Sequence, residues 1–164
     1  MARPWAIPGI KGLEHRIGGL EKWDNSGNIS YDPENHGYMV DLRQERIQKV
    51  QVPDLEVDGD QDFELLVVGW GSTWGAIKGA VSRACRDGYK VGHVHLRHLN
   101  PLPGNLGELL SKSNKVLVPE MNLGQLSKII RAEYLVDAKS ITKVKGVPFT
   151  AGELDHVLRE ALDD

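Results

Sequence analysis

The pattern of hydrophobic and polar positions divides the chain into three sections. Residues 1–31 carry many apolar side chains, among glycines and prolines, without helical or alternating spacing. The second section opens at Asp32-Pro33, a pair suited to cap and begin a helix. Its apolar residues recur on one helix face at Met39, Val40, Ile47 and Val50. We expect this helix to end near Val52-Pro53, because a residue before proline disfavours helical backbone.

The third section predicts strands and helices in alternation. Short apolar runs predict strands over 63–69, 91–96, 115–119 and 140–144. Helix-spaced apolar residues predict helices over 74–85, 106–110, from Asn122 to 130, and from Thr150 to 162. Because the strands are apolar on both faces, we expect a three-layer α/β fold, an open and mostly parallel sheet with helices on both faces.

These patterns predict three parts: an irregular arm and a helix over 1–52, an acidic hinge over 53–62, and the α/β domain over 63–164. The hinge segment holds five carboxylates with one proline and one glycine, which is typical of a solvated connection. The arm is too apolar for a plain disordered tail. It either lies over its own domain or packs on another chain or domain, and the sequence leaves both open.

Composition narrows the function classes. The 164 residues are 40% hydrophobic and carry a net charge of −3, which favours a soluble protein without a nucleic-acid footprint. No apolar run is long enough for a membrane helix, and no charged-then-apolar leader opens the chain, so we expect a cytoplasmic location. One cysteine, Cys85, allows neither an internal disulfide nor a self-contained iron–sulfur cluster.

Ligands of open parallel sheets bind beyond the carboxyl ends of the strands, so three strand-end segments are candidates. In the first, Gly69–Gly75, the glycines do not have dinucleotide spacing, and Arg97 and His98 stand where a ribose-binding acid would be expected. A nicotinamide site is therefore not expected. Two interpretations stay open, namely a tight turn with packed tryptophans and a helix start that binds an anion. The candidate residues for the anion are Gly71, Ser72 and Thr73.

The second segment follows the strand that carries His93 and His95. A His-x-His pair can bind zinc, but three or four ligands are needed and none follows at suitable spacing. We therefore expect buried or interface histidines and no metal. Beyond them, Arg97, His98 and Asn100 are candidates for binding.

The third segment, Pro119–Gln125, has a carboxylate at a strand end. Asn122 is a natural helix cap, and the Gln125 side chain, three residues on, can reach back to it. Glu120, Asn122, Gly124 and Gln125 therefore belong either to capping or to a cleft or interface. No Ser-His-Asp order, Walker loop or H-E-x-x-H helix is present, so we assign no catalytic residue.

Six motifs together resemble one family. They are Arg3–Gly9, Glu14–Lys22, Tyr31–His36, Gly69–Gly75, His95–Pro103 and Val118–Gln125. In this order they resemble the C-terminal, transketolase C-terminal-like part of the alpha subunit of 2-oxoacid:ferredoxin oxidoreductases, nearest the 2-oxoglutarate type. The resemblance implies oxidation of 2-oxoglutarate and coenzyme A to succinyl-CoA and carbon dioxide, with electrons passing to ferredoxin.

The resemblance also implies cofactors and partners. The complex of that family uses thiamine diphosphate, magnesium, a 4Fe-4S cluster and coenzyme A, none of which we expect this chain to hold alone. The implied partners are the beta subunit, the remainder of the alpha subunit, ferredoxin through the complex, and further copies in a homo-oligomer. The pyrimidine-binding domain of the family is absent from this sequence, so we expect a fragment that is inactive by itself.

Two segments are expected to form one edge of the sheet. Gly69–Gly75 and Glu120–Gln125 would face the partner subunit or coenzyme A, and Arg97 and His98 would meet a carboxylate or phosphate. Alternatives are a subunit for a related 2-oxoacid, pyruvate or branched-chain, and a stand-alone module for anion or coenzyme A binding or for oligomerisation.

Overall fold

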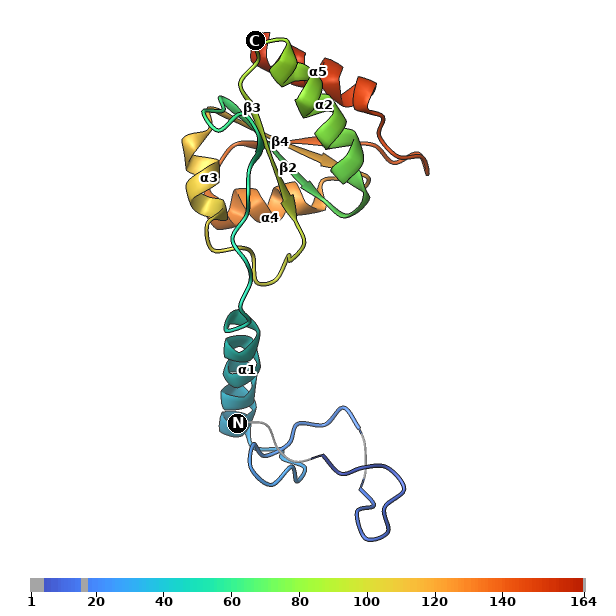
Figure 1. Ribbon diagram of the computed structural model, residues 1–164. Helices are drawn as coiled ribbons and strands as arrows, with labels where there is room; N and C mark the ends of the chain where they lie inside the picture. The colour runs from blue at the N-terminus through green and yellow to red at the C-terminus, as the bar shows by residue number, and fades with distance from the viewer. Residues whose placement is uncertain (1–4, 16–17, 164) are drawn as a thin grey trace. The chain divides into compact units, whose positions relative to one another are not determined.

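The computed structural model describes residues 5–15 and 18–163, and the chain divides into two compact units at Val50 and Gln51 (Figure 1). The beginning of the Arg3–Gly9 motif and residues Arg16 and Ile17 of the Glu14–Lys22 motif lie outside the described residues. Across 5–15 and 18–163, no helix is both long and apolar enough to cross a membrane.

The first unit consists of an irregular arm and helix α1 (Pro33–Gln48). Asp32 caps this helix, since its side chain accepts a hydrogen bond from the Asn35 backbone N–H at 2.8 Å. Helix α1 ends at Gln48, shortly before the predicted Val52-Pro53, and beyond it the Val50 N–H bonds only three residues back, to the Ile47 carbonyl at 3.0 Å.

A five-stranded sheet forms the centre of the second unit. Its strands are β1 (Asp58–Gly59), β2 (Leu65–Trp70), β3 (Val91–Leu96), β4 (Lys115–Glu120) and β5 (Ala138–Thr142). Their order across the sheet is β1-β3-β2-β4-β5. Only β1 runs antiparallel to its neighbour among these strands, so the prediction of a mostly parallel sheet is confirmed.

Helices cover both faces of this sheet, as Figure 1 shows. They are α2 (Trp74–Arg86), α3 (Leu106–Lys112), α4 (Gln125–Tyr134) and α5 (Ala151–Asp163). Alternate side chains of each strand point to opposite faces. Leu66 of β2 packs in one buried cluster with residues of α3 and α4, whereas Leu65 packs in the other with residues of α2 and α5. The predicted three-layer α/β architecture is confirmed.

Strand β1 was not predicted, because two residues are too short for a periodic pattern. It lies within the segment 53–62, where Asp58 and Gly59 pair with β3. The Leu55 backbone N–H and carbonyl both bond to the Asn105 side chain at 2.9 Å. These backbone bonds attach the acidic segment to the second unit, and its role as a hinge stays a prediction.

Helix α5 begins with the predicted capping box. The Thr150 hydroxyl accepts from the Glu153 N–H at 3.2 Å, and the Glu153 carboxylate accepts from the Thr150 N–H at 2.7 Å. The ammonium of Lys143 also donates to this carboxylate at 2.7 Å. The carboxylate therefore joins the helix start to the chain that follows β5.

We predict that Thr150→Ala lowers the free energy of unfolding by about 1 kcal/mol, the usual cost of losing a helix cap. Urea denaturation followed by circular dichroism measures this change. Ser82→Ala is the matched control, since Ser82 is exposed on α2 and its hydroxyl makes no hydrogen bond in the described residues. Equal midpoints for the two variants would contradict the prediction.

Candidate functional site

The carboxyl ends of β2 and β4 meet at the point where the chain connections diverge. Strand β2 leads through α2 to β3 on one side, whereas β4 leads through α4 to β5 on the other. Open α/β sheets bind ligands at such a switch point. Here the Ser72 hydroxyl donates to the Met121 sulfur at 3.6 Å, so the first and third candidate segments are brought together.

The segment after β2 is a tight turn. Gly71 has φ +58°, a region that favours glycine, and Gly71–Thr73 form a short 3-10 helix. The buried Thr73 hydroxyl donates to the Trp70 carbonyl at 2.8 Å and accepts from the Trp70 N–H at 3.3 Å. Thr73 thus closes the turn, while Ser72 stays exposed.

The segment after β4 is organised by a buried carboxyl group. Glu120 is fully buried and accepts from the backbone N–H groups of Leu126 at 2.8 Å and Ser127 at 3.0 Å. It therefore satisfies the free donors at the start of α4. The helix that Asn122 was predicted to cap begins at Gln125, with Gly124 in the N-cap position.

Asn122 instead shapes the turn before α4. Its side-chain oxygen accepts from the backbone N–H groups of Gly124 at 2.8 Å and Gln125 at 2.9 Å. No hydrogen bond runs back from the Gln125 side chain to Asn122 in the described chain. Gly124 has φ +78°, and a Cβ there would lie 2.8 Å from the Ser140 hydroxyl, so this position requires glycine.

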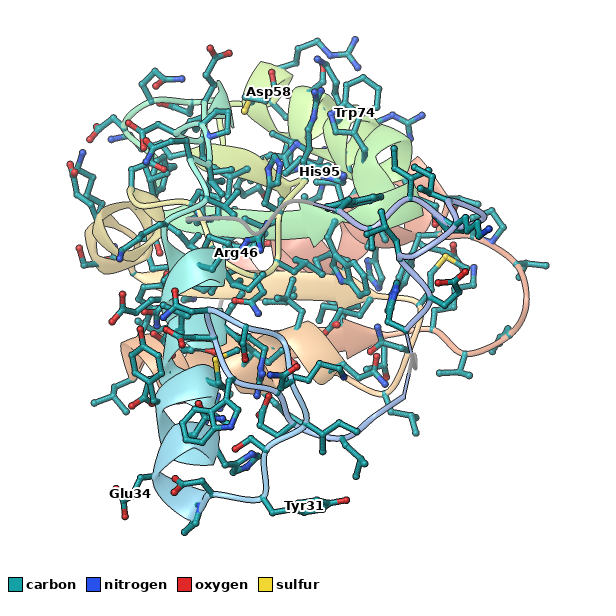
Figure 2. The ribbon with its side chains drawn as sticks, turned by 90° about the horizontal axis from the view of Figure 1, so that it is seen from below. Tyr31, Glu34, Arg46, Asp58, Trp74 and His95 are labelled. Carbon is teal, nitrogen blue, oxygen red and sulfur yellow. The ribbon has the colours of Figure 1, made fainter. Side chains whose placement is uncertain are left out.

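A groove of about 550 Å³ opens at the carboxyl ends of β2 and β3. Its walls are Trp70, Gly71, Trp74, His95, Leu96, Arg97 and Leu99. Figure 2 labels Trp74 and His95. The Arg97 guanidinium is exposed and makes no ion pair within 5–15 and 18–163, so it is available to an anion. The candidates His98 and Asn100 are exposed and do not line this groove.

Trp74 was interpreted from the sequence only as a packing residue. It is 47% exposed, and the Lys78 ammonium lies 4.9 Å from the centre of its ring. Its position at the start of α2, just beyond the end of β2, places it at this edge of the sheet, but that position alone does not distinguish packing from groove lining. The groove therefore offers aromatic surface beside two cations.

His93 and His95 lie two residues apart on β3, and His95 is one of the groove walls. His93 is 1% exposed, and its Nδ1 is 3.9 Å from the Asp58 carboxylate, too long for a hydrogen bond. His95 Nε2 bonds to the Gly71 carbonyl at 3.2 Å, and its Nδ1 is buried without a partner. The rings fill the space above Gly69, where a Cβ would lie 2.9 Å from His95 Nδ1 and 3.2 Å from His93 Nε2.

Burial controls the protonation of both histidines. Desolvation lowers the pKa of His93 to about 4, with a smaller contribution from His95, while the Asp58 charge acts in the opposite direction. Burial also lowers the pKa of His95, opposed by its bond to Gly71. The two rings are therefore neutral at pH 7. Within the described residues, no group of three His, Cys, Asp or Glu side chains is placed to hold a metal ion.

Comparison with known proteins identifies the family. The family model described as pyruvate:ferredoxin oxidoreductase core domain II matches residues 64–154, more than half of the chain. The chain belongs to this family. The matched range runs from β2 into α5, so it contains the groove and the β2–β4 switch point.

Relatives of this family cover nearly the whole chain. The 2-oxoglutarate oxidoreductase subunit KorA of Mycobacterium tuberculosis is 58% identical over 163 residues, which is 99% of this chain and 25% of that protein. Subunit alpha of 2-oxoacid:ferredoxin oxidoreductase 1 of Aeropyrum pernix is 35% identical over 144 residues, 80% of this chain and 22% of that protein. The resemblance to alpha subunits of 2-oxoacid:ferredoxin oxidoreductases is confirmed.

A solved structure agrees with the sequence comparisons. The 2-oxoglutarate:ferredoxin oxidoreductase from Magnetococcus marinus, with 2-oxoglutarate, coenzyme A and succinyl-CoA bound, matches with a TM-score of 0.80 and 30% identity. The match covers 96% of this chain and 28% of that chain. The chain thus spans about a quarter of the length of these relatives.

We predict that stability falls as the pH drops from about 6.5 to about 4. In this window the unfolded state protonates His93, whose ordinary pKa is 6.5, whereas the folded state does not. The pKa difference corresponds to a loss of about 3 kcal/mol. Urea unfolding at several pH values measures it.

The variant His93→Phe should lose the part of this slope that His93 contributes, whatever its absolute stability, and His95, whose pKa burial also lowers, should leave a remainder of the same sign. Glu153 provides an internal reference for this pH dependence. The Lys143 ammonium lowers the pKa of Glu153 to about 2, so the contribution of Glu153 to stability is lost only below pH 4.5. An unchanged slope between pH 6.5 and 4 in His93→Phe would contradict the assignment.

Proposed function

We propose that this chain is part of the alpha subunit of a 2-oxoglutarate:ferredoxin oxidoreductase. The complex would oxidise 2-oxoglutarate with coenzyme A to succinyl-CoA and carbon dioxide and would reduce ferredoxin. The observation that supports this most strongly is the 58% identity to a 2-oxoglutarate oxidoreductase subunit over 99% of the chain. The Magnetococcus marinus enzyme, whose structure contains the same substrate and product, supports it independently.

Within that complex we assign this chain a positioning and interface role. The polar groups at the strand ends already have structural partners, since Glu120 caps α4 and Thr73 closes the turn after β2. The thiol of Cys85 donates to the Val91 carbonyl at 3.3 Å. These residues do not fit a magnesium, cluster or thiamine diphosphate site, so the proposal assigns those cofactors to other parts of the complex.

The edge of the sheet at the carboxyl ends of β2, β3 and β4 is the surface that we assign to contact with the beta subunit or coenzyme A. It combines the exposed Ser72 with the groove that Arg97 borders. A guanidinium without an ion partner binds carboxylates and phosphates through paired hydrogen bonds. The proposal also includes ferredoxin as acceptor through the complex, a homo-oligomeric assembly and a cytoplasmic location.

The first test compares the chain with the complex. We expect the purified chain to reduce no viologen dye, and the complex of whole alpha and beta subunits to reduce it when 2-oxoglutarate and coenzyme A are both present. Pyruvate replaces 2-oxoglutarate in a parallel assay. Turnover by the isolated chain, or a preference for pyruvate, would contradict the proposal.

The second test concerns Arg97. We predict that Arg97→Ala in the whole complex raises the Michaelis constant for 2-oxoglutarate or coenzyme A about tenfold or more, because a hydrogen bond to a charged group contributes about 1.5–3 kcal/mol. Arg83→Ala is the control, since Arg83 is exposed on α2 away from the groove lining. Intact assembly with both Michaelis constants unchanged would exclude this role.

A further inference from the structure

The described part of the first unit, residues 5–15 and 18–50, has no apolar core of its own. Met39 is the one buried apolar side chain in the described part of residues 5–50. Across residues 5–15 and 18–50, thirteen large apolar side chains are exposed, including Trp5 at 90%, Ile7 at 60%, and Ile10 and Leu13 at 46% each. Burying a large apolar side chain contributes about 1.5–3 kcal/mol, so this unit leaves most of its available stabilisation unused.

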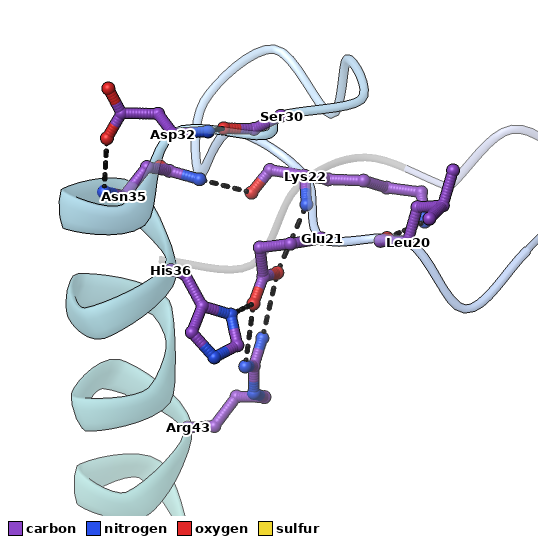
Figure 3. A network of polar contacts seen from close by, with 8 residues as sticks. All are labelled: Leu20, Glu21, Lys22, Ser30, Asp32, Asn35, His36 and Arg43. Atoms are coloured by element: carbon purple, nitrogen blue, oxygen red, sulfur yellow. Dashed lines mark hydrogen bonds and ion pairs between the residues drawn. The ribbon is translucent and has the colours of Figure 1, made fainter.

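The arm nevertheless has a defined attachment to α1, which Figure 3 shows. The Glu21 carboxylate accepts two hydrogen bonds from the Arg43 guanidinium, at 2.9 and 3.1 Å, and lies 3.1 Å from His36 Nδ1. The Asn35 side-chain amide donates to the Lys22 carbonyl at 3.2 Å. Polar contacts therefore hold the arm on the helix where apolar packing does not.

The charges around this attachment are satisfied within the unit. Glu21 is paired with Arg43, and the Lys22 ammonium donates to the carbonyls of Gly18 and Leu20 at 3.0 Å. The exposed apolar side chains of Trp5, Ile7, Ile10 and Leu13 form a row along residues 5–13. Two successive turns arrange this row, since the N–H groups of Ile10 and Leu13 each bond to the carbonyl three residues back. A surface that covers this row has to be apolar, because the row presents few charges to pair with.

We propose that residues 5–15 and 18–50 form a docking module and that its occupant is an apolar surface of the remaining part of the same alpha subunit. The Glu21–Arg43–His36 contacts hold the arm in the shape that docks. The length of the relatives supports this occupant: the Mycobacterium tuberculosis subunit matches 99% of this chain within a protein about four times as long. The inference rests on the proposed function.

The test uses the whole alpha subunit, with and without the beta subunit. Hydrogen–deuterium exchange of the amides in residues 5–31 measures docking. We expect these amides to exchange at least tenfold more slowly in the whole alpha subunit than in the 164-residue chain. The double variant Ile10→Asp and Leu13→Asp should abolish the difference, because it places charges in the apolar contact without altering a buried residue.

Two controls keep this result specific. Val144→Asp introduces a charge at an apolar residue of the second unit that is 60% exposed, and it should leave the arm protected. Glu21→Gln should reduce the protection by weakening the attachment, whereas Glu34→Gln, an exposed residue of α1 without an ion pair in the described chain, should not. Protection that survives Ile10→Asp and Leu13→Asp would overturn the proposal.

The remaining outcomes separate this inference from the proposed function. Protection that rises with protein concentration would indicate a second copy as the occupant, and protection that appears only with the beta subunit would indicate that subunit. Either result overturns the proposal. An active complex with an unprotected arm refutes the docking module alone. A protected arm without 2-oxoglutarate turnover retains the module and refutes the assigned reaction.

Discussion

The buried carboxyl group of Glu120 is the contact on which the edge of the sheet depends. It lies at the last residue of β4, has no exposed surface, and accepts two hydrogen bonds from the first turn of α4. Burying an acidic group is costly unless such partners are present, and hydrogen bonds to charged groups are the stronger ones. The contact therefore ties helix to strand and sets the course of the short turn between them. Met121 lies in that turn and accepts a hydrogen bond from the Ser72 hydroxyl. The segments after β4 and β2 therefore form one surface.

The sequence predicted the central strands and the helices α2 and α5 well, for physical reasons that differ between them. Strand β3 was predicted at its observed bounds because Val91, Val94 and Leu96 mark a short, mostly buried segment that ends before the polar Arg97 and His98. Helix α5 was predicted at its start because Thr150 and Glu153 are three residues apart, and their contacts are local. Strand β1 escaped prediction because it consists of one pair of residues whose partners lie more than thirty residues away.

The candidate site was predicted at the level of segments and less well at the level of side chains. The strand-end rule selected segments that meet in the structure, since Ser72 contacts Met121 after β4, and their role in binding stays a prediction. It did not show that Glu120 shares with Asn122 the free N–H groups at the start of α4, because that depends on how deeply the strand end is buried. Nor did it place Trp74 at the groove, since an aromatic side chain beside a strand end has the same pattern whether it packs or lines a cavity.

The packing above Gly69 has a consequence for how this family diverges. The imidazoles of His93 and His95 and the Ile77 side chain occupy the volume that a Cβ at residue 69 would need, with Ile77 Cδ1 only 2.6 Å from that point. One volume is therefore shared by three strand positions and one helix position. A relative that gains a side chain at 69 has to lose volume at 77, 93 or 95, so these positions change as a set. Because the His95 ring lines the groove and also bonds to Gly71, such an exchange would reshape the groove from within the sheet.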